Sequence, residues 1–369
     1  MNDWKEYKLG DVCSRLKSGK SIKAENVHNS GKYPVIGGNG IRGYSDEFNF
    51  QGECAVIGRQ GAYCGNVRYF KGEFYMTEHA VVVVGNDLAD TYFLSCLLSL
   101  MKLGNLSSQS AQPGLSVQTL SKQIICLPSI QNQKRVSSIL KSLDDKIECN
   151  RRINANLEAQ AQALFDKLIM DIKLPRNTLL SDYMLVNPPR SLAKGKKARY
   201  IDMSSLPTKG SFPTDWTFSN YNGGMKFQNG DTIMARITPC LENGKTAFIN
   251  FLNDEEIAFG STEYIVLTAI DNIYSELCYF LARNNEFVSY ATSHMNGSSG
   301  RQRVSAKDIA NFAMPEIPKE KIIYIGSKFK TIMNVIKNNS LESRRLAELR
   351  DALLPRLMSG ELKVDDVKL

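Results

Sequence analysis

Several glycine-containing turns of this 369-residue chain carry arginine, amide or hydroxyl side chains, which can bind a phosphate or hydrogen-bond to the edge of a base. In the N-terminal part of the chain these candidates are Asn39, Arg42, Arg59, Gln60, Tyr63, Ser110 and Gln112. In the C-terminal part they are Arg236, Asn243, Lys245, Ser298, Arg301, Gln302 and Arg303. The strongest group is Arg301–Arg303, because two arginines and a glutamine share one glycine-led loop. Each side chain could instead be a solvated surface residue, or could satisfy the carbonyl groups of a turn.

Motifs for catalysis are weak. The segment Val186–Arg190 reads VNPPR and is similar to the Asn-Pro-Pro-aromatic motif of adenine methyltransferases, but Arg190 stands where an aromatic ring would stack on a flipped base. No glycine-rich turn between a clear strand and a helix is available to hold S-adenosylmethionine. The three histidines, His28, His79 and His294, do not have the spacing of a metal hydrolase. We therefore predict no catalytic residue and no metal site.

The bulk composition excludes several classes of protein. The net charge of +8 and the isoelectric point of about 8.9 favour a polyanionic partner only weakly. The eight cysteines form no CxxC pair, and their spacing suits neither a zinc ribbon nor a disulfide framework. The chain opens on polar residues, and no apolar run approaches the roughly 18 residues that a membrane helix needs. We therefore expect a cytoplasmic protein with reduced thiols and no membrane contact.

Two long helices are the elements that must hold the polar loops in place. The run Arg135–Ile169 contains neither proline nor glycine, and its apolar residues recur in alternating steps of four and three, which is a heptad pattern. The residues expected to pair are Val136, Leu140, Leu143, Ile147, Asn150, Leu157, Leu164 and Leu168. The pattern returns at one constant offset in Ile325, Phe329, Ile332, Ile336, Asn339, Leu346, Leu353 and Leu357. Both stripes have a polar step, at Asn150 and Asn339, which indicates an internal duplication.

The regions before the two helices also match each other. Gly52–Val67 and Gly230–Thr246 each contain a glycine with an acid, an apolar strand, an arginine and a glycine-containing turn. Glu78 and Glu263 take similar places in the repeat. Short β-branched runs followed by a helical patch predict two β-rich regions, so the fold class is α+β. The expected parts are β-rich regions at 1–129 and 173–317, long helices at 130–172 and 318–360, and a C-terminal tail at 361–369.

An apolar stripe of this length must be buried, and two arrangements would bury it. Each helix could pack on its own β-rich region, but the run from Val136 to Leu168 spans about 50 Å as a helix, longer than a small domain is wide. An antiparallel coiled coil of the two helices fits better, because the polar steps then meet and asparagine is not mismatched with leucine. Such a pair would hold two similar regions at a fixed separation with pseudo-two-fold symmetry. Double-helical DNA suits this arrangement, since its helical turn repeats about every 34 Å.

This organisation resembles the specificity subunits of type I restriction-modification systems over nearly the whole chain. Beside the duplication, the resemblance lies in Leu127–Ile147 at the start of the first helix and in Leu349–Leu362 at the end of the second. It implies two target-recognition domains that read the halves of a gapped, double-stranded DNA target, and helices that set the gap and dock two methyltransferase subunits. One departure is the start of the second helix, where MPEIPKEK has lysine in place of the family's usual glutamine.

The resemblance also implies that the chain itself catalyses nothing and binds no cofactor. S-adenosylmethionine would be bound by the modification subunits, and ATP and magnesium would be used by restriction subunits that translocate and cut DNA. Two alternatives stay open: an enzyme, either a self-contained adenine DNA methyltransferase or a fused restriction subunit, and a coiled-coil adaptor that binds only proteins. The basic run Arg190–Tyr200 is either a phosphate contact or a flexible charged loop.

Overall fold

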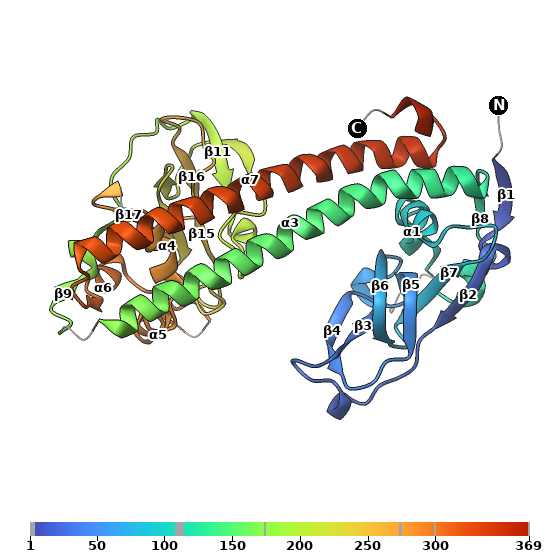
Figure 1. The fold of residues 1–369 in the computed structure, drawn as a ribbon, viewed down its shortest axis with the longest axis horizontal. Coiled ribbons are helices and arrows are strands. Elements are labelled where there is room, and N and C mark those ends of the chain that lie inside the picture. Colours follow the sequence, from blue (N-terminus) through green and yellow to red (C-terminus); the bar gives the residue numbers. More distant parts are fainter. Residues whose placement is uncertain (1–3, 108–113, 173–174, 273–274, 299, 368–369) are drawn as a thin grey trace. The chain divides into compact units, whose positions relative to one another are not determined.

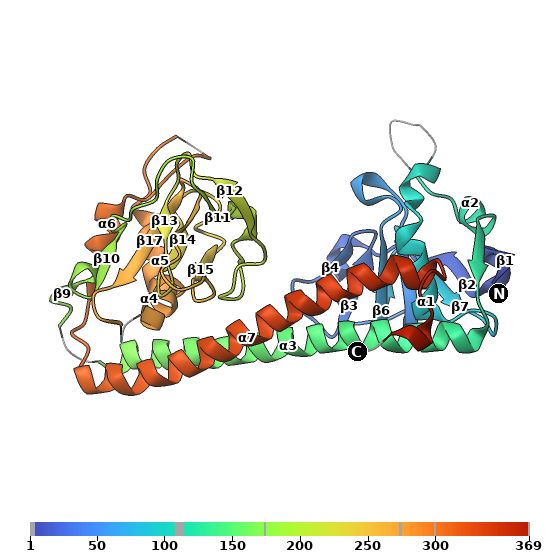
Figure 2. The ribbon, with the colours of Figure 1, turned by 90° about the horizontal axis from the view of Figure 1, so that it is seen from above.

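The computed structural model describes residues 4–107, 114–172, 175–272, 275–298 and 300–367. The chain divides into two compact units (Figure 1; Figure 2): unit 1 comprises Met1–Lys146 and Leu346–Leu369, and unit 2 comprises Ile147–Arg345. Two long helices, α3 (Ile130–Asp171) and α7 (Lys319–Met358), each contribute one part to unit 1 and the other to unit 2. The predicted α+β class with two long helices is confirmed.

A six-stranded sheet forms the centre of unit 1. Its strands, in spatial order, are β2 (Cys13–Ser18), β7 (Ala80–Gly85), β5 (Phe50–Gly58), β6 (Val67–Met76), β3 (Tyr33–Gly37) and β4 (Gly40–Ser45). Ala55 and Ile57 of β5 pack with helix α1 (Thr91–Leu100), whereas Cys54 and Val56 belong to a second apolar cluster. Because successive side chains of a strand point to opposite faces, both faces of the sheet are buried at β7 and at the second half of β5, and these two stretches are apolar runs.

The remaining elements of unit 1 surround this sheet. Strand β1 (Lys5–Lys8) pairs antiparallel with β8 (Ile124–Leu127), the strand that leads into α3. Helix α2 (Val117–Ser121) begins at Ser116, whose hydroxyl oxygen accepts a hydrogen bond from the N–H of Thr119. Short 3₁₀ turns are η1 (Leu9–Val12), η2 (Ala24–Asn26), η3 (Gly61–Tyr63), η4 (Leu103–Leu106) and η8 (Val364–Asp366).

Unit 2 contains two four-stranded sheets and one short strand pair. The first sheet has the order β10 (Met184–Val186), β17 (Tyr264–Ala269), β14 (Thr232–Ala235), β15 (Thr246–Phe248). The second has the order β12 (Thr217–Asn220), β11 (Lys197–Ile201), β16 (Ala258–Gly260), β13 (Lys226–Phe227). The strand pair is β9 (Thr178–Leu179) with β18 (Ala313–Met314). The helical elements are α4 (Ser275–Ala282), α5 (Asn285–Ser293), α6 (Ala306–Ala310), η5 (Leu180–Asp182) and η6 (Met203–Ser205).

The two units repeat one strand order. The series β10-β17-β14-β15 corresponds to β2-β7-β5-β6, and the pair β9–β18 corresponds to β1–β8. Strand β11 pairs in parallel with β16, as β3 does with β6. In unit 1 the long strand β6 pairs with both β5 and β3 and so joins all six strands in one sheet. In unit 2 two short strands replace it: β15 pairs with β14 in the first sheet, and β16 pairs with β11 in the second. The duplication expected from the helices therefore extends through the topology of both units.

Within unit 2, α3 and α7 run antiparallel and meet in a layer of amide side chains. Asn150 Nδ2 donates to Glu342 Oε2 (2.7 Å) and, at 3.3 Å, to the carbonyl oxygen of Asn339. It also lies 3.3 Å from the Ser343 hydroxyl oxygen. Asn339 Nδ2 in turn donates to Asn154 Oδ1 (2.9 Å). The predicted antiparallel pairing, in which the polar steps of the two helices meet, is confirmed.

Within unit 1, the other parts of the same helices are also paired. Arg350 Nη1 of α7 donates to Asp144 Oδ1 of α3 (2.6 Å). Val136 and Leu140 of α3 share an apolar cluster with Leu357 of α7. Asp144 lies beside Arg350, and the earlier residues Val136 and Leu140 lie beside the later residue Leu357, so the two helices are antiparallel here as well.

Both helices also pack on the β-rich regions, so the two arrangements considered from the sequence occur together. Phe165 of α3 and Phe329 of α7 both contact Phe280 of α4, with ring centroids 6.4 and 4.4 Å away. The prediction that Leu164 lies in the buried stripe is wrong, since this residue is 44% exposed. The neighbouring Phe165 is 1% exposed and takes the buried position, because the stripe turns toward α4 as well as toward the partner helix.

A cluster of charged groups fastens the sheet of unit 1 to α3. Glu53 of β5 accepts a hydrogen bond from Lys141 Nζ (3.0 Å) and lies 2.9 Å from Lys71 Nζ. Lys141 Nζ also donates to the hydroxyl oxygen of Tyr69 (3.3 Å). Burial alone would raise the pKa of Glu53, but its hydrogen bonds with Tyr69, Lys71 and Lys141 outweigh burial and lower the pKa to about 2.

Asn150→Ala should destabilise the chain, because it removes the hydrogen bonds that a 1% exposed amide donates to the partner helix. We expect a loss of about 1–3 kcal/mol in the free energy of unfolding, measured with urea. Asn156→Ala, on the exposed side of the same helix, is the matched control and should change that free energy by less than about 0.5 kcal/mol. Equal losses from both variants would contradict a stabilising role for the amide layer.

The charged cluster at Glu53 should make unit 1 sensitive to acid. Its pKa is lower in the folded chain than the ordinary 4.5, so its pairing stabilises the fold fully above that value and is lost as the pH falls toward about 2. Glu53→Gln should therefore lower stability at neutral pH and flatten its decline in acid, as followed by urea unfolding across this range. The exposed Glu47→Gln is the control and should follow the wild-type curve; a Glu53→Gln curve parallel to wild type would disprove the assignment.

Candidate nucleic-acid interface

Three chain segments meet at the end of β5 in unit 1, where several predicted binding residues lie. The backbone N–H of Arg59 donates to the carbonyl oxygen of His79 (3.0 Å), and the Arg59 carbonyl accepts from the N–H of Leu115 (2.9 Å). Gln60 and Gly114 form an antiparallel bridge beside these bonds. The turn after β5, the residue before β7 and the segment before α2 are thus held by backbone groups. Such a frame does not depend on the identity of its side chains.

The same three segments meet in unit 2. The N–H of Arg236, directly after β14, donates to the carbonyl oxygen of Glu263 (3.0 Å). The Arg236 carbonyl accepts from the N–H of Val304 (3.0 Å), and Ile237 forms a bridge with Arg303. The repeat position that the sequence assigns to the two arginines is therefore matched bond by bond in the backbone.

This frame corrects the alignment of two carboxylates. Glu78 and Glu263 are not equivalent, because Arg59 bonds to His79 whereas Arg236 bonds to Glu263. The counterpart of Glu263 is therefore His79, whose Nε2 lies 3.3 Å from Glu78 Oε1. A one-residue shift between two short, similar motifs is invisible in the sequence, and the strand pairing reveals it. The two units place chemically different side chains at equivalent positions.

The turn between β3 and β4 joins the cluster in unit 1. A Cβ atom added to Gly38 would lie 3.1 Å from the carbonyl oxygen of His79 and 3.3 Å from the Cα of Gly58, so a side chain here would be crowded against both neighbouring segments. The next residue, Asn39, accepts a hydrogen bond at Oδ1 from Arg68 Nη2 (3.3 Å). Arg68 is a functional candidate that no glycine-rich turn marks in the sequence, because it lies within strand β6.

The predicted residues of unit 1 differ in exposure. The exposed members are Asn39, Arg42, Gln60 and Tyr63. Arg59 is half-buried. Ser110 and Gln112 lie outside the described residues, in the segment that leads to Gly114. The exposed cationic, amide and phenol groups around the β5 end are the chemistry expected of a surface that contacts phosphates and base edges.

The predicted residues of unit 2 divide into free and engaged side chains. The exposed members are Asn243, Ser298 and Arg301. Lys245 Nζ donates to the carbonyl oxygen of Met203 (2.7 Å), and the buried Nε of Arg236 has no hydrogen-bond partner in the described part of the chain. Gln302 is half-buried, and its carbonyl accepts from the N–H of Thr238 (3.0 Å). Lys245 therefore supports a turn, whereas Arg301 projects from the loop.

Arg303, predicted as a binding residue, is engaged by a carboxylate. Its Nε donates to both oxygens of Glu263 (3.0 and 2.9 Å), and its Nη2 donates to Oε1 (2.7 Å). The hydrogen bonds from Arg303 and its positive charge hold the pKa of Glu263 below the usual range. The pair is close to neutral as a whole, so it contributes little net attraction for a phosphate.

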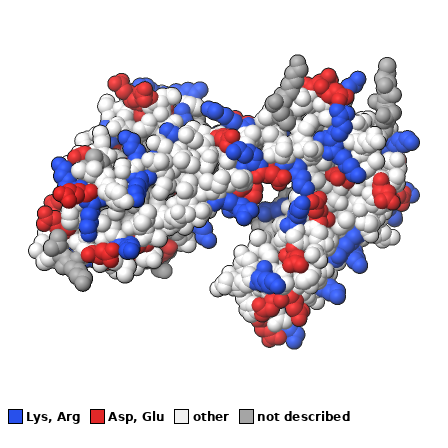
Figure 3. Space-filling view, in the orientation of Figure 1, with Lys and Arg blue, Asp and Glu red and all other residues white. Residues whose placement is uncertain are grey.

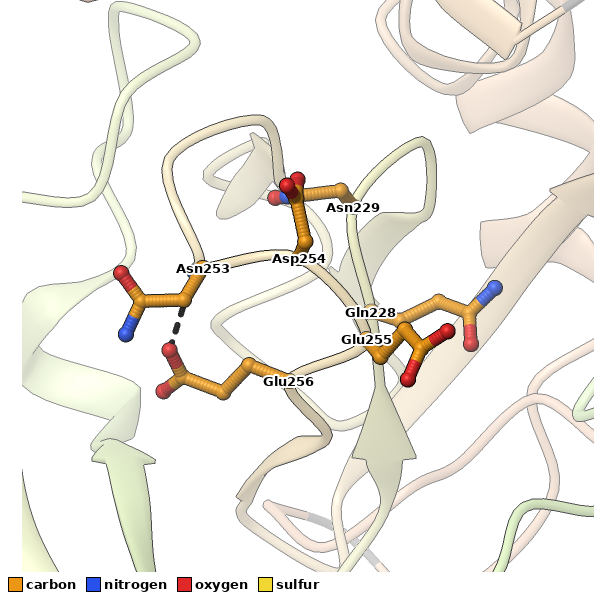
Figure 4. A pocket seen from close by; sticks show the side chains of 6 residues that line it. All are labelled: Gln228, Asn229, Asn253, Asp254, Glu255 and Glu256. Carbon is orange, nitrogen blue, oxygen red and sulfur yellow. Dashed lines mark hydrogen bonds between the residues drawn. The ribbon is translucent and has the colours of Figure 1, made fainter.

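Charge is mixed over the surface of both units, with cationic and acidic side chains interspersed on the face that Figure 3 shows. A hollow of about 390 Å³ in unit 2 is lined by Gln228, Asn229, Asn253, Asp254, Glu255 and Glu256 (Figure 4). Three of these six side chains are carboxylates, which repel phosphate. The exposed loops, rather than this hollow, therefore have the charge that suits a nucleic acid.

The VNPPR segment is held inside unit 2. Arg190 Nη2 donates to Asp231 Oδ1 (2.6 Å) and to the hydroxyl oxygen of Thr268 (3.1 Å). The two charged side chains are only 10% and 1% exposed. Lys226 Nζ donates to the carbonyl oxygen of Arg190 (2.6 Å). This arginine is thus committed to an internal ion pair and is not presented to a base.

The rest of the basic run has two environments. Lys194, Lys196 and Lys197 are exposed. Arg199 pairs with Glu256 (3.1 Å), and its guanidinium lies 5.3 Å from the ring centroid of Trp216.

Among the described residues, no group of three or more His, Cys, Asp or Glu side chains is placed to hold a metal ion. No helix in the same part of the chain is long and apolar enough to span a membrane.

Comparisons with known proteins agree with the resemblance seen in the sequence. Residues 1–159 match the family described as the type I restriction modification DNA specificity domain. The chain is 42% identical over 144 residues to the type I restriction enzyme EcoprrI specificity subunit of Escherichia coli, which covers 38% of this chain and 36% of that protein. It is 22% identical to the HindI specificity subunit of Haemophilus influenzae over 98% of this chain and 100% of that protein.

A solved structure also shares the fold. It is the S subunit of a type I restriction-modification system from M. genitalium, with a TM-score of 0.63 and 17% identity over 96% of each chain. The match to the E. coli relative spans little more than a third of that protein's length. Together these findings confirm the resemblance to type I specificity subunits.

Arg190→Ala should destabilise unit 2, because it leaves the carboxylate of Asp231 buried without its cation. The expected loss is about 3 kcal/mol or more in the free energy of unfolding, measured with urea. Lys194→Ala, an exposed cation of the same basic run, is the matched control and should have a small effect. A near-neutral effect of Arg190→Ala would refute the internal role of this arginine.

Proposed function

We propose that this chain, whose residues 1–159 carry a type I restriction modification DNA specificity domain, is the DNA-recognition subunit of a type I restriction-modification complex. The observation that carries the proposal is the repeated three-segment frame, in which Arg59 and Arg236 occupy equivalent places. Each frame is surrounded by exposed cationic, amide and hydroxyl side chains, and these are the groups that bind phosphates and base edges.

Each unit reads one half of a bipartite, double-stranded target. The frames are alike in backbone and different in side chains: the position of His79 in unit 1 is taken by Glu263 in unit 2, and that of Gly114 by Arg303. Base recognition depends on the donors and acceptors that side chains present, so different side chains on one frame imply different bases. The target is therefore not a palindrome, and its halves are separated by bases that neither unit reads.

The paired helices set the length of that gap. Their antiparallel pairing is fixed by the amide layer at Asn150, Asn154 and Asn339, so the helices have a single register. Exposed apolar side chains, Ile153 and Tyr324 on the unit 2 parts of the helices and Leu349 on the unit 1 part, are the contacts that we expect the two methyltransferase subunits to use. The lysine-containing start of α7 belongs to this surface and gives it a different charge from the family's usual glutamine.

The chain is a targeting subunit and leaves the chemistry to its partners. Its potential methyltransferase motif is committed to the Arg190–Asp231 pair, and this supports a non-catalytic role. The modification subunits bind S-adenosylmethionine and methylate adenine, and restriction subunits use ATP and magnesium. The assembly works on DNA in the cytoplasm as a host defence.

Lengthening the helices should change the gap without changing the bases read. One heptad inserted into each helix beside the amide layer adds about 10 Å, or about three base pairs. Cells that carry the variant chain with its modification subunits should methylate the same half-sites at a gap longer by about that amount, as read by methylome sequencing. The same seven residues inserted at the exposed turn beside Lys209 are the control and should leave the gap unchanged. An unaltered gap in the helix variant would refute the proposal.

A further inference from the structure

The guanidinium group of Arg303 hydrogen-bonds to groups of unit 2 itself. Three of its hydrogen bonds go to the carboxylate of Glu263, at 2.7 to 3.0 Å. A fourth, from Nη1, goes to the carbonyl oxygen of Arg301 (3.0 Å). Bidentate recognition of a base needs two adjacent N–H groups free in one plane. Arg303 has used its Nε and Nη2 edge on Glu263, and its Nη1 on the Arg301 carbonyl, so neither edge of the guanidinium is wholly free.

These bonds fasten a loop at its base. The loop 294–303 closes where Arg303 and Asn296 exchange two backbone hydrogen bonds, of 2.9 and 3.0 Å. A turn bond from the N–H of Arg301 to the carbonyl of Ser298 (3.0 Å) shapes the tip. Ile237 bridges Arg303 from the neighbouring turn. The Arg303 side chain adds a link from this loop to Glu263, the residue that precedes β17.

Arg301 is the cation that remains available. It is exposed, and within the described residues its side chain donates no hydrogen bond to the protein. Its backbone is held on both sides, by the carbonyl bond to Arg303 Nη1 and the turn bond to Ser298. A cation whose backbone is held in place loses less entropy when it binds a partner.

Among the described residues of unit 1, no ion pair joins the positions that correspond to Glu263 and Arg303. The positions of Glu263 and Arg303 are taken there by His79 and Gly114, and glycine has no side chain that could reach across. The backbone frame of unit 1 is formed without such an ion pair. The pair is therefore not required to build the frame, and its role is specific to loop 294–303.

We propose that Arg303 is a positioning residue, which braces loop 294–303 against Glu263 so that Arg301 is presented to the DNA. This inference rests on the proposed function and deepens it, because it assigns the contact to Arg301 and the support to the Glu263–Arg303 pair. The carboxylate would otherwise repel the phosphates nearby, and the arginine neutralises it.

The test compares the affinity of the full chain for two duplexes of equal length: one carrying the sequence methylated in cells, and one of mixed sequence. The readout is the ratio of the two affinities, with its dependence on salt. Glu263→Gln and Arg303→Gln should each lower the ratio about fivefold or more. Removal of a negative charge alone would strengthen binding to both duplexes and leave the ratio unchanged, so a fall in the ratio separates bracing from simple electrostatics.

Arg301→Gln should lower the affinity and reduce the salt slope by about one released counterion. The double variant Glu263→Gln with Arg303→Gln removes one negative and one positive charge together, so it should leave the salt slope unchanged. The exchanged pair Glu263→Arg with Arg303→Glu should recover much of the ratio, since the ion pair is rebuilt. Lys307→Gln, an exposed cation on the neighbouring α6, is the matched control for loss of one charge.

A Glu263→Gln variant that binds the target as well as or better than wild type would overturn the inference while leaving the proposed function intact. The same holds if Arg303→Gln alone reproduces the slope change of Arg301→Gln and the exchanged pair recovers nothing. A wild-type chain with no salt-dependent binding to either duplex would overturn both. Urea unfolding of each variant separates loss of the loop from loss of the fold.

Discussion

The amide layer between α3 and α7 in unit 2 is the constraint on which the rest of the molecule depends. Asn150 is 1% exposed, and a buried amide costs free energy unless it finds partners. Its donor groups reach the opposite helix, while its Oδ1 has no partner in the described residues. Apolar contacts alone would tolerate a slip of one heptad. A slip would oppose these amides with apolar side chains, so the layer selects one register more than it adds stability.

The β-rich parts of the two units keep the backbone frame around Arg59 and Arg236 constant while the side chains on its surface differ. Arg59 and Arg236 are held through their backbone N–H and C=O groups, and β5 and β14, the strands that lead into them, are buried on both faces. Because backbone hydrogen bonds do not depend on the side chain, residues at the rim can differ without loss of the fold. The change from His79 and Gly114 to Glu263 and Arg303 is accommodated in this way.

The arginines of this chain show why net charge says little about binding. Arg190 and Arg303 neutralise carboxylates, and Arg199 lies against aromatic rings while it pairs with Glu256. These cations lower the cost of keeping acids within the fold and add little to the field outside it. Arg42 and Arg301 are exposed and are therefore among the cations that can release counterions from DNA.

Strong local patterns determined much of the fold from the sequence. The heptad steps predicted two long helices, and the repeated polar residues favoured an antiparallel pairing in which desolvated amides meet each other. Glycine-bounded runs of β-branched residues predicted the β-rich regions, because such side chains favour a strand with a buried face. The resemblance to type I specificity subunits followed from this organisation.

Tertiary structure alone decided which polar side chains are free. The sequence placed Arg301 and Arg303 in one group, yet only Arg303 faces a carboxylate, because Glu263 is brought beside it by the pairing of β14 with β17. The backbone bonds of Arg59 and Arg236 show that His79, and not Glu78, is the counterpart of Glu263. Phe165 replaces Leu164 in the buried stripe through its contact with α4. These outcomes depend on contacts between residues far apart in the chain, and no local pattern encodes them.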